Sequence, residues 1–341
     1  MRFPRLFVPL PTVMLQGHGD DTYRYGDVRV NFSSNIYGGA DLSALKSYLS
    51  NRLEFIGQYP EPEAYSLEML IAEREGIPNE CVLVTNGATD AIYLIAQMLA
   101  GEGYRHYHIP QPTFSEYEDA CRMFGMTEGD DGILWLCNPN NPTGQVINPS
   151  PNTAITVLDQ SYELFTLQPL MSAREAVACE KIIQLHSMTK TYAVPGLRLG
   201  YVVAAAPVME CLRRYVRPWS VNTLAIEAGK WLTKHDVVAV PDIWGYLKET
   251  QRLRMRLNGI PGISVAPTDT CFMLAEIKGN TAADLKDYLI KEHRLLIRDA
   301  SNFHGLTPRH FRISTQRPDE NDLLVEAIRE FISQADGEQT L

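Results

Sequence analysis

Short apolar runs alternate with helical patterns through the middle of the sequence, which leaves few folds open. In the clearest unit, an apolar run at 81–85 and a tight turn precede apolar residues whose spacing predicts a buried helix face over 91–99. Similar apolar runs follow at 133–137, 154–158, 181–185 and 199–203. Such alternation is typical of α/β proteins with a mainly parallel sheet.

The pattern changes near residues 235–244, after which a long helical pattern leads into a second series of strands and helices. A chain of 341 residues also exceeds the size at which one hydrophobic core usually stops growing. We therefore expect a large domain at 46–240 that contains the mainly parallel sheet. Residues 1–45 and 241–341 are expected to form a smaller α+β domain.

Two connections are too short for the helix that usually links parallel strands. Between the runs that end at 137 and begin at 154, Asn, Pro, Thr and Ser dominate and no helical period is visible. The segment 124–131 is similarly short. We expect a bare loop on this face of the sheet.

Composition excludes several classes of partner. The formal net charge of −10 gives no basic surface for nucleic acid or anionic membranes. The six cysteines form no C-x-x-C pair, which argues against a metal site or disulfides and favours a reducing cytoplasm. Pro4, Pro9 and Pro11 interrupt the apolar N-terminal stretch, so no signal peptide is expected, and no apolar run is long enough to cross a bilayer.

The strongest chemical pattern lies at 187–201, after one of the predicted strands. It places Lys190 on a loop, with hydroxyls at Ser187 and Thr189 and a guanidinium at Arg198. A lysine with a lowered pKa can condense with an aldehyde, while hydroxyls and a guanidinium suit a phosphate ester. An isolated lysine of this kind is more often a surface residue beside a turn.

Three other loops carry polar residues near the ends of predicted strands. Residues 138–144 are rich in Asn and Pro, which composition alone would assign to an ordinary turn. Asp159 and Tyr162 follow a buried strand. The loop 86–89 opens a helix whose N-terminus attracts phosphate, although Asn-Gly followed by Thr is also a common turn.

Residues 187–201 resemble the lysine motif of the class I/II aminotransferases, which are pyridoxal-5′-phosphate enzymes of fold type I. Residues 138–144 and 159–162 resemble two further motifs of the family, although Gln160 replaces the usual glutamate. The resemblance implies an aspartate-aminotransferase-like fold, with Lys190 forming a Schiff base with the cofactor. It implies cofactor contacts from Gly87, Ala88, Thr89, Phe114, Asn141, Asp159, Tyr162, Ser187, Lys190 and Arg198.

The resemblance also implies individual roles. Ser187 and Arg198 would bind the cofactor phosphate, Asn141 and Tyr162 the phenolic oxygen, and Asp159 the pyridine nitrogen, which keeps the ring an electron sink. Lys190, Asp159, Tyr162 and Asn141 are the expected catalytic residues. Phe114 would stack on the ring, although an aromatic residue there is often mere core.

The family resemblance further implies a homodimer. In the family, a tyrosine from the neighbouring subunit reaches the cofactor phosphate, and the matching residue is Tyr59, followed by Pro60. The alternative is that Tyr59 is an ordinary aromatic residue in a turn.

Segments over nearly the whole chain resemble the threonine-phosphate decarboxylases of cobalamin biosynthesis within this family, and more loosely the histidinol-phosphate aminotransferases. The first resemblance implies that the substrate's phosphate and carboxylate are bound by His18, Asn35, Arg298 and Arg312. Two arginines suit a dianion. Asp20 and Asp21 depart from the decarboxylase pattern, which has glycine and asparagine there, and they place acidic charge near the anion site.

Three functions remain open. The first is decarboxylation of L-threonine O-3-phosphate to (R)-1-aminopropan-2-yl phosphate, and the second is a transaminase such as histidinol-phosphate aminotransferase. The third is cofactor binding without catalysis, against which intact Lys190, Asp159 and Arg198 argue. The first two differ in which bond at the substrate's Cα is held perpendicular to the cofactor plane.

Overall fold

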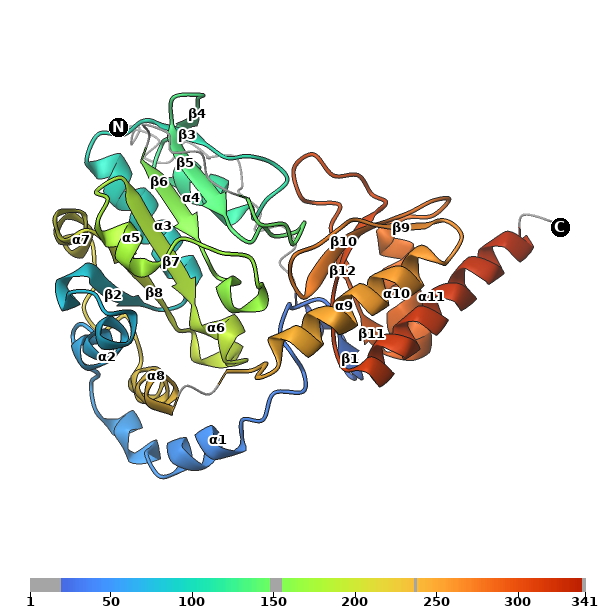
Figure 1. Cartoon of the computed structure of the whole chain (residues 1–341), viewed down its shortest axis with the longest axis horizontal. Helices are drawn as coiled ribbons and strands as arrows, with labels where there is room; N and C mark the ends of the chain where they lie inside the picture. Colours follow the sequence, from blue (N-terminus) through green and yellow to red (C-terminus); the bar gives the residue numbers. More distant parts are fainter. Residues whose placement is uncertain (1–19, 148–154, 236–237, 339–341) are drawn as a thin grey trace, which may run out of the picture.

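A seven-stranded sheet forms the centre of the larger part of the computed structural model, which describes residues 20–147, 155–235 and 238–338 (Figure 1). Its strands, in spatial order, are β2 (Val82–Thr85), β8 (Gly200–Ala204), β7 (Ile182–Ser187), β6 (Thr156–Asp159), β5 (Ile133–Cys137), β3 (His106–His108) and β4 (Thr127–Glu128). All neighbours pair in parallel except β8, which runs antiparallel to β2 and β7. The mainly parallel α/β sheet predicted from the sequence is confirmed.

Helices cover both faces of this sheet, which is why its central strands are almost continuously apolar. On one face, Leu83, Val157 and Ile183 belong to a buried cluster with residues of α3 (Ala88–Gly101), α4 (Glu116–Met123) and α7 (Ala206–Arg213). On the other face, Val84 and Val203 pack with α2 (Tyr65–Glu75), α5 (Ala173–Val177) and α8 (Thr223–His235). The short helices are η1 (Thr22–Arg24), α1 (Ser43–Ser50), η2 (Leu53–Gly57), η3 (Asn79–Cys81), η4 (Glu163–Phe165), α6 (Met188–Thr191) and η5 (Pro195–Leu197).

A four-stranded antiparallel sheet forms the second part, which lies beside the first (Figure 1). Its order is β12 (Arg298–Asp299), β13 (His310–Ser314), β10 (Phe272–Ile277) and β9 (Ile263–Val265). A separate pair joins β1 (Val30–Asn31) in parallel to β11 (Leu295–Leu296), so the N-terminal segment packs with the C-terminal part. The helices here are α9 (Ile243–Asn258), α10 (Ala282–His293) and α11 (Pro318–Glu338).

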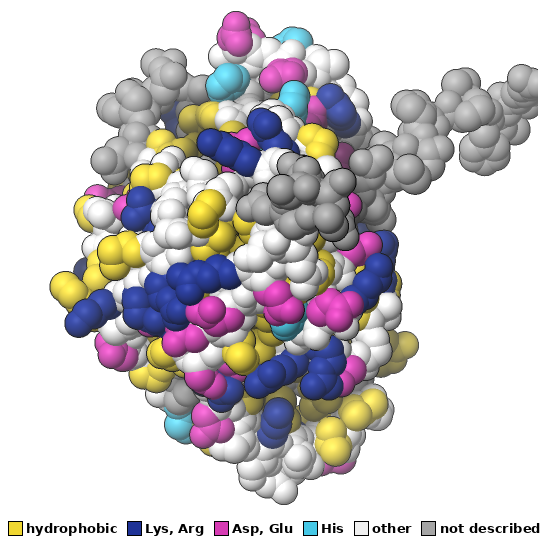
Figure 2. Space-filling view, turned by 90° about the vertical axis from the view of Figure 1, so that its right-hand side faces the viewer, with side chains coloured by type: hydrophobic (Ala, Val, Ile, Leu, Met, Phe, Trp, Pro, Cys, Tyr) yellow, Lys and Arg dark blue, Asp and Glu magenta, His cyan; other side chains and the backbone are white. Residues whose placement is uncertain are grey.

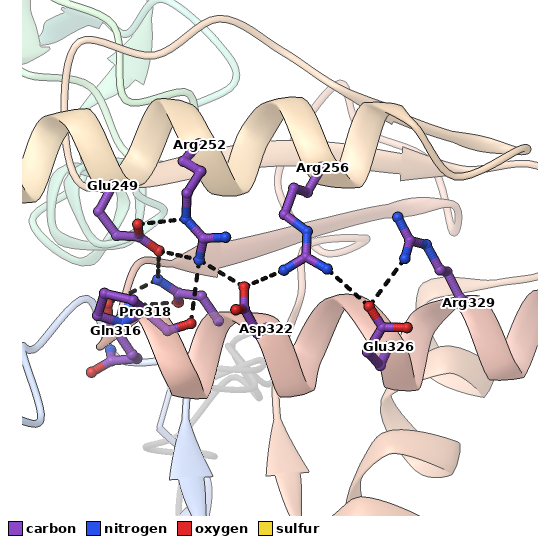
Figure 3. Close-up of polar contacts among 9 residues, drawn as sticks. Glu249, Arg252, Arg256, Gln316, Pro318, Asp322, Glu326 and Arg329 are labelled. Carbon is purple, nitrogen blue, oxygen red and sulfur yellow. Dashed lines mark hydrogen bonds and ion pairs between the residues drawn. The ribbon is translucent and has the colours of Figure 1, made fainter.

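Helix α9 connects the two parts. Tyr246 near its start belongs to the core of the larger part, whereas Leu253 and Leu257 belong to the core of the smaller one. A network of ion pairs joins α9 to α11 (Figure 3), linking Glu249, Arg252, Arg256, Asp322, Glu326 and Arg329. Networks of ion pairs contribute more to stability than isolated surface pairs, so this network helps to hold α11 against α9.

The connection between β5 and β6 contains no helix within its described residues, 138–147 and 155, as the sequence predicted. The other short connection, at 124–131, contains the two-residue strand β4. Because β3 lies between β4 and β5 in the sheet, the chain crosses β3 on its way from β4 to β5. A Cβ at Gly132 would lie 2.6 Å from backbone atoms of His106 and Tyr107. Glycine therefore permits this close crossing, which replaces a longer connection.

Two findings concern possible partners. Among the described residues, no helix has the length and apolar character required to span a membrane, and no three metal-ligating side chains form a group. On the face of the molecule shown in Figure 2, basic and acidic side chains lie interspersed.

Candidate active site

A cavity of about 350 Å³ contains residues from both parts of the chain and lies at the carboxyl ends of the parallel strands. Asp159 and Ser187, which end β6 and β7, line it together with Lys190. Strands β12 and β13 contribute Arg298 and Arg312. Ligands of open α/β sheets bind at this edge, so the position alone makes the cavity a candidate active site.

Most of the predicted site residues meet in this cavity. It is lined by Ala88, Thr89, Phe114, Asn141, Asp159, Tyr162, Ser187, Lys190, Arg198, Arg298 and Arg312. Gly87 and Asn35 contact lining residues, as described below. Tyr59 is not among the lining residues: the residue is 86% exposed, and its ring packs against that of Trp219 at 5.5 Å between centroids. His18 lies outside the described residues.

Lys190 lies in the single-turn helix α6, directly after β7. Its Nζ donates a hydrogen bond to the backbone carbonyl of Ser34 at 2.9 Å. Burial lowers the pKa of Lys190 to about 8, and the positive charge of Arg312 acts in the same direction. A lower pKa increases the share of neutral amine, the form that attacks an aldehyde, so Lys190 suits covalent binding of an aldehyde cofactor.

Asp159 supplies a buried carboxylate at the end of β6. Tyr117 Oη donates to its Oδ2 at 2.6 Å, and the backbone N–H of Ser161 donates to its Oδ1 at 2.8 Å. Burial raises the pKa of Asp159 above its ordinary value, and these hydrogen bonds oppose the shift. A protonated ring nitrogen in front of the carboxylate would favour its ionised form.

The N-terminus of α3 and Arg198 form an anion-binding region. Gly87 precedes the helix with φ +85°, and no side chain caps the first N–H groups. The guanidinium of Arg198 lies over this turn, since a Cβ at Gly87 would lie 2.8 Å from Nη2 of Arg198. Ala88, Thr89 and Ser187 line the same cavity. Uncapped N–H groups, hydroxyls and a guanidinium together suit a phosphate ester.

Arg298 and Arg312 are register partners on the antiparallel strands β12 and β13. Only 8% and 4% of their surfaces are exposed. Burial, together with the positive charge of Arg312, lowers the pKa of Arg298 to about 10. Two neighbouring guanidiniums match the geometry of carboxylate and phosphate oxygens, so this pair suits an anionic ligand.

Tyr162, Asn35 and Asn141 form a polar group beside the arginines. Asn35 Nδ2 donates to Tyr162 Oη at 3.2 Å, and Arg312 donates to Asn141 Oδ1 and to the carbonyl of Ser33. Among the described residues, Asn35 Oδ1 and Arg312 Nε are buried without a hydrogen-bond partner. Because buried polar atoms are almost always paired, these two fit a polar ligand in the cavity.

The structure adds residues that the sequence did not indicate. Tyr117 supports Asp159, and its ring lies edge-on to Phe114 at 5.7 Å between centroids. The backbone carbonyls of Ser33 and Ser34 hold Arg312 and Lys190. A carbonyl is present at every position, so no side-chain pattern could have identified these two.

The two acidic residues that depart from the decarboxylase pattern have different environments. Asp21 pairs with Lys286 at 2.6 Å. Asp20 lines the cavity, and its Oδ1 accepts hydrogen bonds from Thr22 at 2.9 Å and from Asn31 at 2.8 Å. Asp20 therefore brings its negative charge into the cavity, whereas Asp21 lies in an ion pair and acts on Arg298 through its charge.

Comparison with known proteins agrees with this geometry. The family model "Aminotransferase class I and II" matches residues 126–328. A threonine-phosphate decarboxylase of Salmonella typhimurium is 29% identical over 90% of this chain and 92% of its own length. A histidinol-phosphate aminotransferase of a Thermoanaerobacter species is 28% identical over 81% and 85%.

A solved structure resembles the chain as well. The crystal structure of L-threonine-O-3-phosphate decarboxylase from Porphyromonas gingivalis matches with a TM-score of 0.84 and 38% sequence identity, covering 89% of this chain and 99% of that one. The aspartate-aminotransferase-like fold expected from the sequence is confirmed by this similarity. The chain belongs to the aminotransferase class I and II family.

Proposed function

We propose that this chain is a pyridoxal-5′-phosphate-dependent lyase that decarboxylates L-threonine O-3-phosphate to (R)-1-aminopropan-2-yl phosphate in cobalamin biosynthesis. The observation that carries the proposal is the buried pair Arg298 and Arg312 in a cavity that also holds Lys190. A substrate with a carboxylate and a phosphate offers planar and tetrahedral oxygen groups that match the forks of two guanidiniums. The Salmonella and Porphyromonas relatives, which carry the name of this activity, support the proposal.

The chain's own residues fit pyridoxal 5′-phosphate. The N-terminus of α3, Ser187 and Arg198 would hold its phosphate, Asp159 its ring nitrogen, and Tyr162 and Asn141 its phenolic oxygen, with Phe114 against the ring. Lys190 would bind its aldehyde carbon. When bound, the cofactor accepts the electron pair released at the substrate's Cα.

Orientation of the substrate selects the reaction. Arg298 and Arg312 would orient the substrate so that the bond from Cα to its carboxylate is the one that breaks. Carbon dioxide would be released, and Lys190 or water would supply the proton that Cα takes up in its place. If the Cα–H bond were oriented to break instead, Lys190 would remove that proton and the enzyme would transaminate.

The test measures both reactions on the purified protein with pyridoxal 5′-phosphate. With L-threonine O-3-phosphate we expect carbon dioxide in step with substrate loss, and none from the Lys190→Ala variant. With histidinol phosphate and a keto acid we expect no amino transfer. Amino transfer without carbon dioxide would favour the aminotransferase, and absence of both reactions would favour a cofactor-binding protein without catalysis.

We also infer a homodimer in which Tyr59 reaches the cofactor phosphate of the neighbouring subunit. Its support is the exposure of two adjacent aromatic rings, Tyr59 at 86% and Trp219 at 51%. Aromatic residues are enriched at protein–protein interfaces, where they bury much apolar area. We propose a cytoplasmic location, because all six cysteines are unpaired.

A further inference from the structure

His186 and Glu163 form an ion pair directly behind the residues that line the cavity. Nδ1 of His186 lies 3.0 Å from Oε1 of Glu163, and the histidine side chain is 4% exposed. His186 precedes Ser187 at the end of β7, and Glu163 follows Tyr162 after β6. The pair thus joins two neighbouring strand ends, next to two residues that would contact the cofactor.

The His186–Glu163 pair adds a side-chain contact between the segments of β6 and β7, just past the point where their backbone hydrogen bonds end. The N–H of Gln160 donates to the carbonyl of Leu185 at 2.8 Å, and the N–H of Glu163 then donates to the carbonyl of Gln160 at 3.0 Å in a turn. The contact between Glu163 and His186 fastens this turn to β7. Because Tyr162 lies within the turn, its position depends on the contact.

Aromatic packing fixes the orientation of the histidine ring. His186 stacks on Tyr201, its register partner on β8, at 4.5 Å between centroids and 7° between planes. Arg74 from α2 donates to the hydroxyls of Tyr201 at 3.0 Å and of Tyr192 at 2.8 Å. Tyr192 follows α6, the helix that contains Lys190. The contacts through Tyr201 and Arg74 therefore connect the residues just before Lys190 in the chain with the residue that follows its helix.

The charges around His186 favour its protonated form. Although burial opposes a charged ring, Glu163 raises the pKa of His186 above its ordinary value, with Glu75 acting in the same direction and Arg74 against it. In turn, the charge of His186 lowers the pKa of Asp159, against the effect of burial. The pair therefore also favours the ionised carboxylate that would face the ring nitrogen.

We propose that His186 and Glu163 are positioning residues for the cofactor, holding Tyr162 and Ser187 in place. Neither side chain lines the cavity, so they act through these neighbours and touch neither ligand. The inference rests on the proposed function in one respect, that pyridoxal 5′-phosphate is the ligand.

The experiment measures the Kd of pyridoxal 5′-phosphate by equilibrium dialysis of the full-length chain, for wild type, His186→Gln, Glu163→Gln and the double variant. Each single change should weaken cofactor binding about tenfold. The double variant should bind less weakly than the product of the two single effects predicts, since both changes remove the same ion pair. The pH dependence of the visible absorbance should also change. At saturating cofactor, the KM for L-threonine O-3-phosphate should stay within about twofold, because Arg298 and Arg312 are untouched.

A second histidine–glutamate pair provides the control. His293 of α10 lies 3.4 Å from Glu330 of α11, in the smaller part, so His293→Gln and Glu330→Gln should leave the Kd and the absorbance unchanged. Glu163→Gln keeps the shape of a side chain that is 29% exposed, so it provides the test even if His186→Gln does not fold. Variants that bind the cofactor like wild type, or control variants that lose it equally, would overturn the positioning role. A wild type without cofactor binding would instead overturn the proposed function.

Discussion

Arg312 donates a hydrogen bond to Asn141, so a residue expected to bind the substrate contacts one expected to bind the cofactor. Its register partner Arg298 has other neighbours, donating to the carbonyl of Asp299 and to Asn302. A change at Arg298 should therefore affect substrate binding alone. A change at Arg312 can also disturb Asn141, one of the residues expected to bind the cofactor.

Replacing Arg298 or Arg312 with alanine should weaken substrate binding. Each charge-assisted hydrogen bond contributes about 1.5–3 kcal/mol, so the KM for L-threonine O-3-phosphate should rise about ten- to a hundredfold or more. The visible absorbance of the bound cofactor should remain. Arg309→Ala is the matched control, since Arg309 is half-exposed and pairs with Glu276 at 2.8 Å. Unchanged turnover in either variant, or loss of the cofactor from Arg298→Ala, would contradict a role of these arginines in substrate binding.

Removing the buried charge of Lys190 should stabilise the cofactor-free protein. The pKa of Lys190 is about 8 in the folded chain and returns toward 10.5 on unfolding. Between these values the unfolded chain binds more protons, so the free energy of unfolding rises with pH, and below about pH 8 the folded state carries the full cost of the buried charge.

Lys190→Met should therefore raise the free energy of unfolding at pH 7 by about 1–3 kcal/mol, allowing for the lost hydrogen bond to Ser34. The difference should shrink as the pH rises toward 10.5. Urea unfolding across this range measures it, with exposed Lys46→Met as the control. A variant less stable than wild type at every pH would mean that the folded chain does not disfavour the charged lysine.

Tyr59 should act on the neighbouring subunit's site. A mixture of Tyr59→Ala and Lys190→Ala chains, each inactive or nearly so alone, would then contain hybrid dimers with one complete site. We expect mixing under subunit exchange to restore activity, measured as carbon dioxide release. Mixing Lys190→Ala with Asp159→Ala is the control, because both residues line one chain's cavity and no hybrid site is complete. A fully active monomer in sedimentation, or no recovery on mixing, would exclude the shared site.

Patterns that depend on local chemistry could be predicted from the sequence. Lys190, Asp159 and Ser187 follow apolar strands, and parallel strands bring their carboxyl ends to one edge, so their meeting follows from the α/β pattern. The bare loop after β5 was visible as a lack of helical period. The division at residues 46 and 240 stays a prediction, and α1 (Ser43–Ser50) spans the first of these positions.

Other features had no local signal. Strand β3 has the sequence His-Tyr-His and only three residues, too short and too polar to be distinguished from a loop. The partnership of β1 with β11 joins segments more than 260 residues apart, which no periodicity reports. No pattern in the sequence assigns Tyr117 to the site, and only the fold places its hydroxyl on Asp159.

The proposed function depends above all on which lysine binds the cofactor. The holoenzyme would be reduced with borohydride, digested, and its peptides mapped for the residue that carries the cofactor. We expect the label on Lys190 in a yellow protein, and no covalent label in Lys190→Ala. A label on any other lysine, or a wild-type protein that takes up no label, would contradict it.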